Sequence, residues 1–289
     1  MRYLRSFEFA SVGWEEQFLN DIRRTVYTTF YPLGVLSGKG IDSLEMTPLT
    51  ILYGENGSGK TTVLNVMAEK VHAERNTLYN RSNFFEDYLK HCDADLASDR
   101  PDEIRIITSD DVFDFMLELR HLNEGIDRKR EELFEDWVDA KYAHFQLKSL
   151  EDYEELKKIN AARSYTQSRF VRDRLMGNVR EHSNGESAFL YFTEKIRERG
   201  LYFLDEPENS MSPERQKELA GFLIDSVRFY DCQIIMATHS PFLLAIPGAV
   251  VYNLDEPGAP RQKWSDLPNI QAYYRLFEEH REAFESPSG

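Results

Sequence analysis

The stretch that decides the fold runs from Leu49 to Thr62 and reads LTILYGENGSGKTT. Its first five residues form a short apolar run that passes directly into a glycine-rich turn. From Gly54 to Thr61 the turn matches the pattern G-x-x-x-x-G-K-[ST] at every fixed position. A helix is expected to begin at about Gly59. The strand, turn and helix together predict a loop that binds the phosphates of a nucleotide.

Each residue type in this loop has a physical reason to be there. Glycine lets the backbone wrap closely around a phosphate and point successive amides at it, and the following helix adds the positive end of its dipole. Lys60 is expected to neutralise the β- and γ-phosphates, and Thr61 to offer its hydroxyl to Mg²⁺. A chance match is the alternative, but this one follows a strand and opens a helix, as the mechanism requires. The residues expected to contact the nucleotide are Gly54, Glu55, Asn56, Gly57, Ser58, Gly59, Lys60, Thr61 and Thr62.

Two later apolar runs end in residues suited to phosphate chemistry. Residues 201–204 read LYFL and lead into Asp205 and Glu206. Asp205 is expected to hold the water shell of Mg²⁺, and Glu206 to polarise the attacking water as a general base. Residues 233–237 lead to His239, which in a nucleotide-binding sheet can reach the γ-phosphate. Without the phosphate loop, the two acids would equally suit a capped loop, and the histidine would usually be interpreted as a structural hydrogen bonder. The presence of the loop favours the catalytic interpretation of these residues.

The pattern of apolar residues predicts an α/β fold with a mostly parallel sheet. Continuous buried strands separated by helices are typical of a parallel sheet covered on both faces. Residues 3–9 alternate as a strand at an edge or in a second sheet does, which predicts an antiparallel N-terminal portion. We expect an N-terminal lobe over 1–110, a charged helical insertion over 111–181 and a C-terminal lobe over 182–289. The expected core strands are 49–53, 104–108, 201–204, 233–237 and 250–254, with helices beginning at Pro213 and spanning 270–284.

Composition limits the classes of protein to which the chain can belong. With 289 residues, 41% of them apolar, it can bury a large core. The net charge is −15, so the chain as a whole does not have the excess of basic residues that is typical of nucleic-acid-binding proteins. A local basic groove would nevertheless suffice for binding DNA or RNA. No apolar run approaches the roughly 18 residues of a membrane span, and the N-terminus lacks a signal-peptide pattern. Cys92 and Cys232 lack metal-site spacing and are interpreted as two buried thiols. We expect a cytoplasmic chain without membrane insertion.

Five motifs, in this order, resemble the ABC ATPase superfamily. They are the phosphate loop, SNGES at 183–187, LYFLDEPEN at 201–209, NSMSP at 209–213 and THSP at 238–241. Asn184 and Glu186 stand where transporter subunits usually carry glycine and glutamine, and the stretch from Lys60 to Ser183 is longer than in those subunits. The chain is therefore more similar to soluble ATPases of the RecF and SMC type. It is most similar to small bacterial proteins known only as predicted AAA or ABC ATPases.

This resemblance implies a P-loop ATPase of the ABC type that uses ATP and Mg²⁺ and works as a dimer. Two copies of the chain would close around two ATP molecules. The signature turn of one copy would complete the site of the other, with Ser183, Asn184 and Gly185 binding the γ-phosphate in trans.

Two features of the superfamily are missing or altered. The glutamine loop, which contacts Mg²⁺, is expected at residues 106–113 but lacks its glutamine; Asp110 or Ser109 can substitute as the metal contact. A helix N-cap followed by acids at the favourable end of the helix dipole is an equal alternative. No aromatic residue upstream of the loop is placed to stack on adenine, since Tyr53 is expected inside the sheet, and Arg5 is a weak candidate.

The insertion carries a basic segment between Arg163 and Arg180, opposed by the single acid Asp173. It can contact the phosphates of DNA or RNA, or meet a partner subunit or the ATP site. Helix solubility with intramolecular pairing is the remaining alternative. We expect an ATPase that acts on nucleic acid or an effector protein in DNA repair, maintenance or defence. An energy-coupling subunit of a membrane transporter and a nucleotide-dependent scaffold are the alternatives. The arginines are Arg163, Arg169, Arg172, Arg174 and Arg180.

Overall fold

The computed structural model describes residues 1–22, 26–144, 153–178 and 184–285. The chain divides into two compact units. Unit 1 contains Met1–Val112 and Asn184–Gly289, and unit 2 contains Phe113–Ser183. The insertion proposed from the sequence, 111–181, overlaps almost all of unit 2. No helix in the described ranges combines the length and the apolar character needed to cross a membrane.

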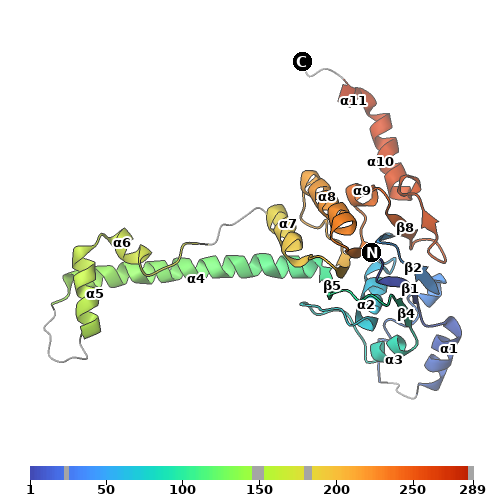
Figure 1. The fold of residues 1–289 in the computed structure, drawn as a ribbon, viewed down its shortest axis with the longest axis horizontal. Coiled ribbons are helices and arrows are strands. Elements are labelled where there is room, and N and C mark those ends of the chain that lie inside the picture. The colour runs from blue at the N-terminus through green and yellow to red at the C-terminus, as the bar shows by residue number, and fades with distance from the viewer. Residues whose placement is uncertain (23–25, 145–152, 179–183, 286–289) are drawn as a thin grey trace. The chain divides into compact units, whose positions relative to one another are not determined.

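The larger sheet of unit 1 has six strands in the order β5-β6-β7-β3-β8-β9. Two of them, β5 and β8, are labelled in Figure 1. All neighbours from β5 to β8 pair in parallel, and β9 pairs with β8 in the antiparallel sense. Every residue of β3, β6 and β7 is buried, as strands inside a covered parallel sheet must be. The predicted mostly parallel α/β fold is thus confirmed, whereas the edge strand β9 was not predicted. The strands are β3 (Leu49–Tyr53), β5 (Glu103–Thr108), β6 (Gly200–Asp205), β7 (Gln233–Ala237), β8 (Val250–Asn253) and β9 (Arg261–Gln262).

A smaller antiparallel sheet has the order β2-β1-β4, with β1 (Leu4–Glu8), β2 (Ser43–Glu45) and β4 (Asp93–Leu96). The predicted N-terminal strand is therefore the middle strand of a second sheet and not an edge.

The two sheets are joined by the side chain of Gln233, which is fully buried at the start of β7. Its Oε1 accepts hydrogen bonds from the amides of Tyr3 (2.7 Å) and Leu4 (2.8 Å). Its Nε2 donates to the carbonyl oxygens of Leu4 (2.8 Å) and Thr47 (3.0 Å). One amide side chain thus satisfies four backbone groups that strand pairing leaves open.

Helix α2 (Lys60–Lys70) occupies the centre of the core of unit 1. It contacts β6 and β7 of the large sheet and β4 of the small one. The residues predicted to point inward are fully buried, which fixes the orientation of the helix that follows the phosphate loop. They are Val63, Leu64, Val66 and Met67.

Among the other helices of unit 1, the one expected to begin at Pro213 is confirmed and the one expected over 270–284 needs a correction, whereas the helices at 12–21, 85–90 and 241–244 were not predicted. Helix α8 begins at Pro213, and the Oγ of Ser212 accepts a hydrogen bond from the amide of Arg215 (3.4 Å), which confirms the predicted N-cap. The single helix predicted over 270–284 is wrong, because the chain leaves helical geometry at His280 and two helices result. The helices are α1 (Val12–Asp21), α3 (Phe85–Lys90), α7 (Asn184–Lys195), α8 (Pro213–Phe229), α9 (Pro241–Leu244), α10 (Pro268–Glu279) and α11 (Arg281–Glu285), with 3₁₀ turns η1 (Ser37–Lys39) and η3 (Trp264–Asp266).

Unit 2 is helical over its described residues. It contains most of α4 (Ser109–Tyr142), which begins in unit 1, together with α5 (Tyr153–Ser164) and α6 (Gln167–Arg172). The Nε1 of Trp137 donates to the carbonyl oxygen of Tyr165 (3.2 Å) and ties α4 to the turn after α5. A small core of its own makes this unit compact; it consists of Leu133, Ala140, Ile159, Ala162, Phe170 and Val171.

Candidate functional site

The phosphate loop joins β3 to α2 and has the backbone that its glycines allow. Gly57 (φ 83°) and Gly59 (φ 94°) adopt the left-handed conformation, and Gly59 caps α2. A Cβ at Gly54 would lie 2.4 Å from the Oγ of Ser58 and 3.2 Å from an Oδ of Asp255. A side chain at Gly54 would therefore collide with Ser58, and one at Gly57 or Gly59 would strain the backbone, so the geometry agrees with the glycines of the motif.

Lys60 is buried at the base of this loop. Its Nζ donates to the carbonyl oxygens of Gly54 (2.7 Å) and Glu55 (3.2 Å) and lies 3.9 Å from Oε1 of Glu206. The Oγ of Ser58 is buried and has no hydrogen-bond partner among the described residues. A pocket of about 240 Å³ above the loop thus combines a buried cation with an open polar group, which fits the phosphates of a nucleotide. Its lining is Val35, Asn56, Gly57, Ser58, Gly59, Lys60, Thr61, Thr62 and Glu206.

Asp205 ends β6 next to the first turn of α2. The Oγ1 of Thr61 donates to its Oδ1 over 3.2 Å. Burial raises the pKa of Asp205 to about 6, and the hydrogen bond from Thr61 partly opposes this rise. A carboxylate beside a hydroxyl is a donor set that suits Mg²⁺, which prefers oxygen ligands and retains much of its water.

Glu206 follows in a left-handed backbone conformation (φ 48°), and its amide donates to the carbonyl oxygen of Ala237 (2.9 Å). For a residue with a Cβ this conformation costs about 1 kcal/mol or more, and such strain is concentrated at functional sites. It places Oε1 of Glu206 within 3.8 Å of Nδ1 of His239, in addition to the contact with Lys60. The structure therefore brings Lys60, Asp205, Glu206 and His239 together, as the sequence predicted.

Glu208 is a buried member of this site that the sequence reasoning missed. Its Oε1 accepts hydrogen bonds from Oγ1 of Thr238 (2.7 Å) and from the amide of His239 (3.0 Å), and lies 3.6 Å from Nδ1 of His239. It ties the turn after β6 to the turn after β7. The available signal was a third acid two residues after Glu206.

Asp255 is a second residue that was missed. Both of its carboxylate oxygens lie within hydrogen-bond distance of the amide of Glu55, at 3.1 and 3.0 Å. The carboxylate follows β8 and fixes the beginning of the phosphate loop, about 200 residues earlier in the chain. No local pattern in the sequence indicates such a contact.

At the expected place of the glutamine loop, the structure is compatible with both interpretations, a metal contact from Asp110 or Ser109 and a helix N-cap. Ser109 and the exposed Asp110 line a pocket of about 410 Å³ that also includes Thr61 and Asp205. Thr108 and Asp111 form a reciprocal cap at the N-terminus of α4: Oδ2 of Asp111 accepts from the amide (2.6 Å) and Oγ1 (2.9 Å) of Thr108, and the amide of Asp111 donates to that Oγ1 (3.4 Å). Asp110, between them in the sequence, lines the same pocket as Asp205.

The signature turn is only partly described, since Ser183 lies outside the described residues. Asn184 and Gly185 begin α7, and a Cβ at Gly185 would lie 3.1 Å from the carbonyl oxygen of Ser210. The turn over 209–213 thus packs directly against the N-terminus of α7. Among the described residues, none of α7 lines the pocket above the phosphate loop. Within the described residues, Asn184 and Gly185 are therefore not part of the pocket at the loop of their own chain.

Arg5 and Tyr53 were considered in the sequence as contacts to the adenine of ATP. Arg5 is exposed on β1 and is not among the residues that line the pocket above the loop, whereas Val35 is. Tyr53 is buried in the sheet, as expected.

The two cysteines, Cys92 and Cys232, are buried free thiols, as predicted.

In unit 2, several arginines of the basic segment have contacts within the unit. Arg163 donates to the carbonyl oxygen of Ala143 (2.8 Å), Arg169 stacks over Tyr165 (4.4 Å), and Arg174 stacks over Phe170 (3.8 Å). Arg180 lies outside the described residues. Intramolecular pairing therefore accounts for part of this segment.

Comparison with known proteins identifies the family. Among solved structures, one described as a metal-chelate type ABC transporter in an inward-facing conformation is 16% identical, with 82% of this chain and 80% of that chain covered and a TM-score of 0.36. A dimeric ATP-binding cassette in a post-hydrolysis state, bound to ADP and Pi, is 12% identical, with 79% and 92% covered and a TM-score of 0.35. These two similarities are too low to support an argument, and no curated protein matches the sequence.

The family described as "AAA domain, putative AbiEii toxin, Type IV TA system" matches residues 88–245, which is more than half of the chain. The matched range includes Asp205, Glu206 and His239, and the phosphate loop precedes it. The chain therefore belongs to this AAA-domain family of P-loop ATPases.

Proposed function

We propose that the chain hydrolyses ATP to ADP and phosphate with Mg²⁺, at a site that a second copy of the chain completes. One observation carries the proposal. The carboxylate of Glu206 lies 3.9 Å from Nζ of Lys60 and directly follows Asp205, which is hydrogen-bonded to Thr61. A base, a phosphate-binding cation and a pair of metal-binding oxygens are the parts that phosphoryl transfer to water requires.

In this proposal each residue has one role. Lys60 neutralises the β- and γ-phosphates, and Thr61 and Asp205 hold Mg²⁺, which would supply charge neutralisation as the bond to the leaving oxygen breaks. Glu206 orients the attacking water and accepts its proton at Oε1. His239, 3.8 Å from that oxygen, fixes the water and the base in place. Asp110 is proposed as a further contact to the metal shell, from the pocket beside Asp205.

The second copy is proposed because one chain carries one phosphate loop and one signature turn, and in its described part the two do not line a common pocket. The N-terminus of α7 does not line the pocket above the loop in the described part of its own chain. It begins a helix of 12 residues, whose first amides and dipole suit an anion. We propose that Ser183, Asn184 and Gly185 of one copy bind the γ-phosphate held by the other.

The branch of the superfamily and the purpose of the cycle are proposals of the same kind. We assign the chain to the soluble RecF- and SMC-like ATPases, with unit 2 acting on nucleic acid or on an effector protein in DNA repair, maintenance or defence. Arg172, exposed on α6, belongs to the surface proposed to contact phosphates. Stimulation of turnover by DNA or RNA that weakens as salt rises would support this role, because phosphate contacts release counterions.

The base is tested with Glu206→Gln, which keeps the size of the side chain and removes its basicity. Turnover of ATP is expected to fall by about 10²- to 10⁴-fold while ATP still binds. Glu198→Gln is the matched control, because Glu198 is exposed and precedes β6 at the opposite end of that strand. Turnover in Glu206→Gln equal to that of the control would contradict the assignment of the base.

Completion of the site by a second copy is tested by mixing two inactive variants. Lys60→Ala destroys the loop half of a site, and Ser183→Arg destroys the signature half. A mixed dimer of the two contains one intact composite site. Turnover that reappears on mixing supports the shared site, whereas two variants that stay inactive together, as each does alone, would refute it.

A further inference from the structure

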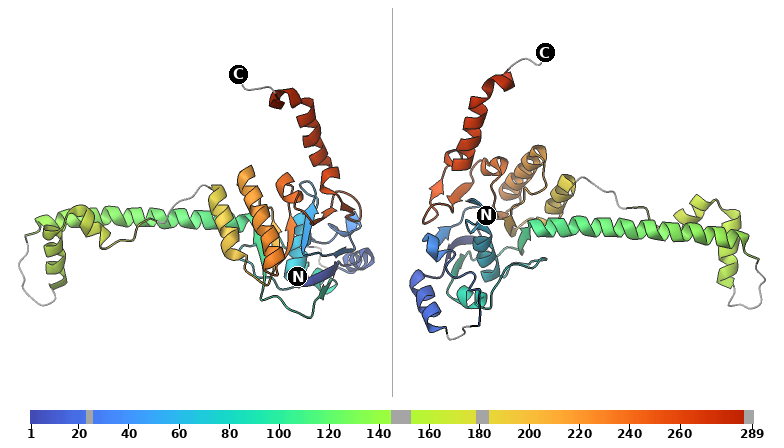
Figure 2. Two further views of the ribbon diagram at one scale, coloured as in Figure 1. Left: turned by 45° about the horizontal axis from the view of Figure 1, so that its top comes forward. Right: turned by 180° about the vertical axis from the view of Figure 1, so that it is seen from behind.

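The C-terminal helices of unit 1 carry an unusual exposed apolar face. Figure 2 shows α10 and α11 standing away from the sheets of this unit in both views. Ile270 anchors the base of α10 in the core, and large apolar side chains continue at helical spacing beyond it. Phe277 and Phe284 contact one another with ring centroids 5.7 Å apart, so the face continues from α10 onto α11. The exposed side chains are Tyr273 (47%), Tyr274 (59%), Leu276 (48%), Phe277 (54%) and Phe284 (70%).

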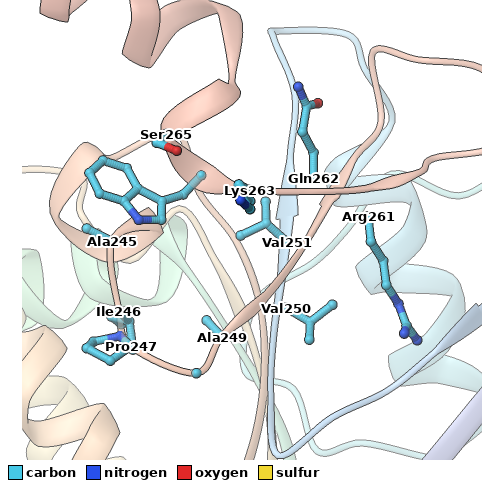
Figure 3. A pocket seen from close by; sticks show the side chains of 12 residues that line it. Ala245, Ile246, Pro247, Ala249, Val250, Val251, Arg261, Gln262, Lys263 and Ser265 are labelled. Atoms are coloured by element: carbon cyan, nitrogen blue, oxygen red, sulfur yellow. The ribbon is translucent and has the colours of Figure 1, made fainter.

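A pocket of about 480 Å³ lies at the base of this arm. Figure 3 shows the apolar side chains of Ile246, Pro247 and Val250 along it, with the basic residues Arg261 and Lys263 beside them. Trp264, which begins the 3₁₀ turn before α10, also lines the pocket and is 40% exposed. The lining of the pocket therefore combines apolar side chains with basic ones.

We infer that a second copy of the chain covers both features, through antiparallel pairing of the two arms. The arm consists of α10, whose 12 residues span about 18 Å at 1.5 Å per residue, and of the short α11, which follows the break at His280. Antiparallel pairing of the two α10 helices about a twofold axis near Leu276 directs α11 of each copy toward the base of the other arm. The tip of each arm, with Phe284, then reaches the pocket at the base of the other arm. Such a contact is self-complementary and closes as a dimer.

The charges fit this arrangement. The tip of the arm, α11, carries Glu282 and Glu285 against the single cation Arg281, which pairs with Glu278 (2.6 Å) and Glu285 (3.7 Å), so the tip keeps a net negative charge. The pocket that it reaches carries Lys263 and Arg261. Arg261 also pairs with Glu45 (2.8 Å), so Lys263 is the main basic contact for an incoming tip. The same acids disfavour an anionic lipid surface, which would repel the tip. Aromatic residues are enriched at the centre of protein interfaces, and charged residues belong to the rim around it.

This contact uses neither the phosphate loop nor the signature turn. The dimer is therefore expected without nucleotide, in addition to the shared ATP site. The two proposals fail separately: loss of the arm contact changes the mass of the nucleotide-free protein, and loss of the shared site changes the result of mixing the two inactive variants.

The experiment measures the mass of the full chain by sedimentation equilibrium in EDTA without nucleotide. The protein concentration runs from about 1 to 100 µM, which covers dimer dissociation constants in the micromolar range. The expected mass is that of two chains at the upper concentrations. Phe277→Asp places one charge on each side of the axis and is expected to raise the dimer dissociation constant by at least about 30-fold. Phe229→Asp is the control, because Phe229 is also exposed (73%) and ends α8, outside this face.

A second variant tests the position of the axis. Leu276→Cys is expected to form a disulfide with itself between copies under mild oxidation, whereas Phe229→Cys is not. The natural thiols do not interfere, since Cys92 and Cys232 are buried. A single-chain mass at 100 µM, or an unchanged dimer in Phe277→Asp, would overturn the proposal.

Discussion

Replacing Asp205 by asparagine is expected to stabilise the nucleotide-free protein at alkaline pH while removing its response to Mg²⁺. The carboxyl group is buried, and burial raises its pKa from the usual 3.8 to about 6. At pH 8 the folded protein must keep this group ionised in a poorly solvated position beside Glu206. Asparagine keeps an oxygen that accepts the hydrogen bond from Thr61 (3.2 Å in the present chain) and carries no charge.

The size and the sign follow from the two pKa values. The folded chain binds the proton more tightly than the unfolded chain, so stability declines as the pH rises from 3.8 through 6. A difference of about two pKa units corresponds to about 3 kcal/mol, and the whole of it is lost above pH 7. Asp205→Asn should therefore raise the free energy of unfolding by up to about 3 kcal/mol at pH 8, and by about half as much at pH 5.

The assay is urea denaturation of both proteins in EDTA at pH 5 and pH 8, repeated at pH 8 with Mg²⁺ and ATP. We expect the variant to gain about twice as much stability at pH 8 as at pH 5, and only the natural protein to gain stability from the ligands. A variant that is less stable at pH 8, or that gains equally at both pH values, would show that burial of this charge is not costly. The reasoning about Asp205 would then be refuted.

Three further predictions concern residues that the sequence did not single out. Gln233→Leu leaves four buried backbone groups without partners and should lower the free energy of unfolding by about 4 kcal/mol or more, measured by denaturation. Asp255→Ala frees the amide of Glu55 and should raise the ATP dissociation constant about 10-fold in calorimetry, a loss of about 1.4 kcal/mol; an unchanged constant would mean that the loop holds its shape without this contact. Glu208→Gln should lower kcat about 10-fold at constant KM, since it loosens His239 and not the nucleotide. A raised KM with unchanged kcat would instead place Glu208 in binding.

The parts of the site that were predictable are those encoded by neighbouring residues. The phosphate loop, the acids after β6 and His239 each follow a buried apolar strand, and parallel strands bring their carboxyl ends to one edge. Gln233 and Asp255 were not predictable, because their partners lie about 200 residues away and a single polar residue has no periodicity. The break at His280 was missed for a different reason: the apolar spacing continues from α10 into α11 although the backbone does not.

The order of the strands also determines how the chain can be made. β3 pairs only with β7 and β8 among the described strands, and both are encoded about 180 to 200 residues after it. At about 5 to 20 residues per second, β3 and the loop behind it wait roughly 10 to 40 s on the ribosome before a partner strand is synthesised. During that time an apolar strand without neighbours is open to wrong pairing. This topology therefore implies that the sheet closes slowly and late. A holding chaperone that binds the first half of the chain would reduce misfolding before the partner strands are made.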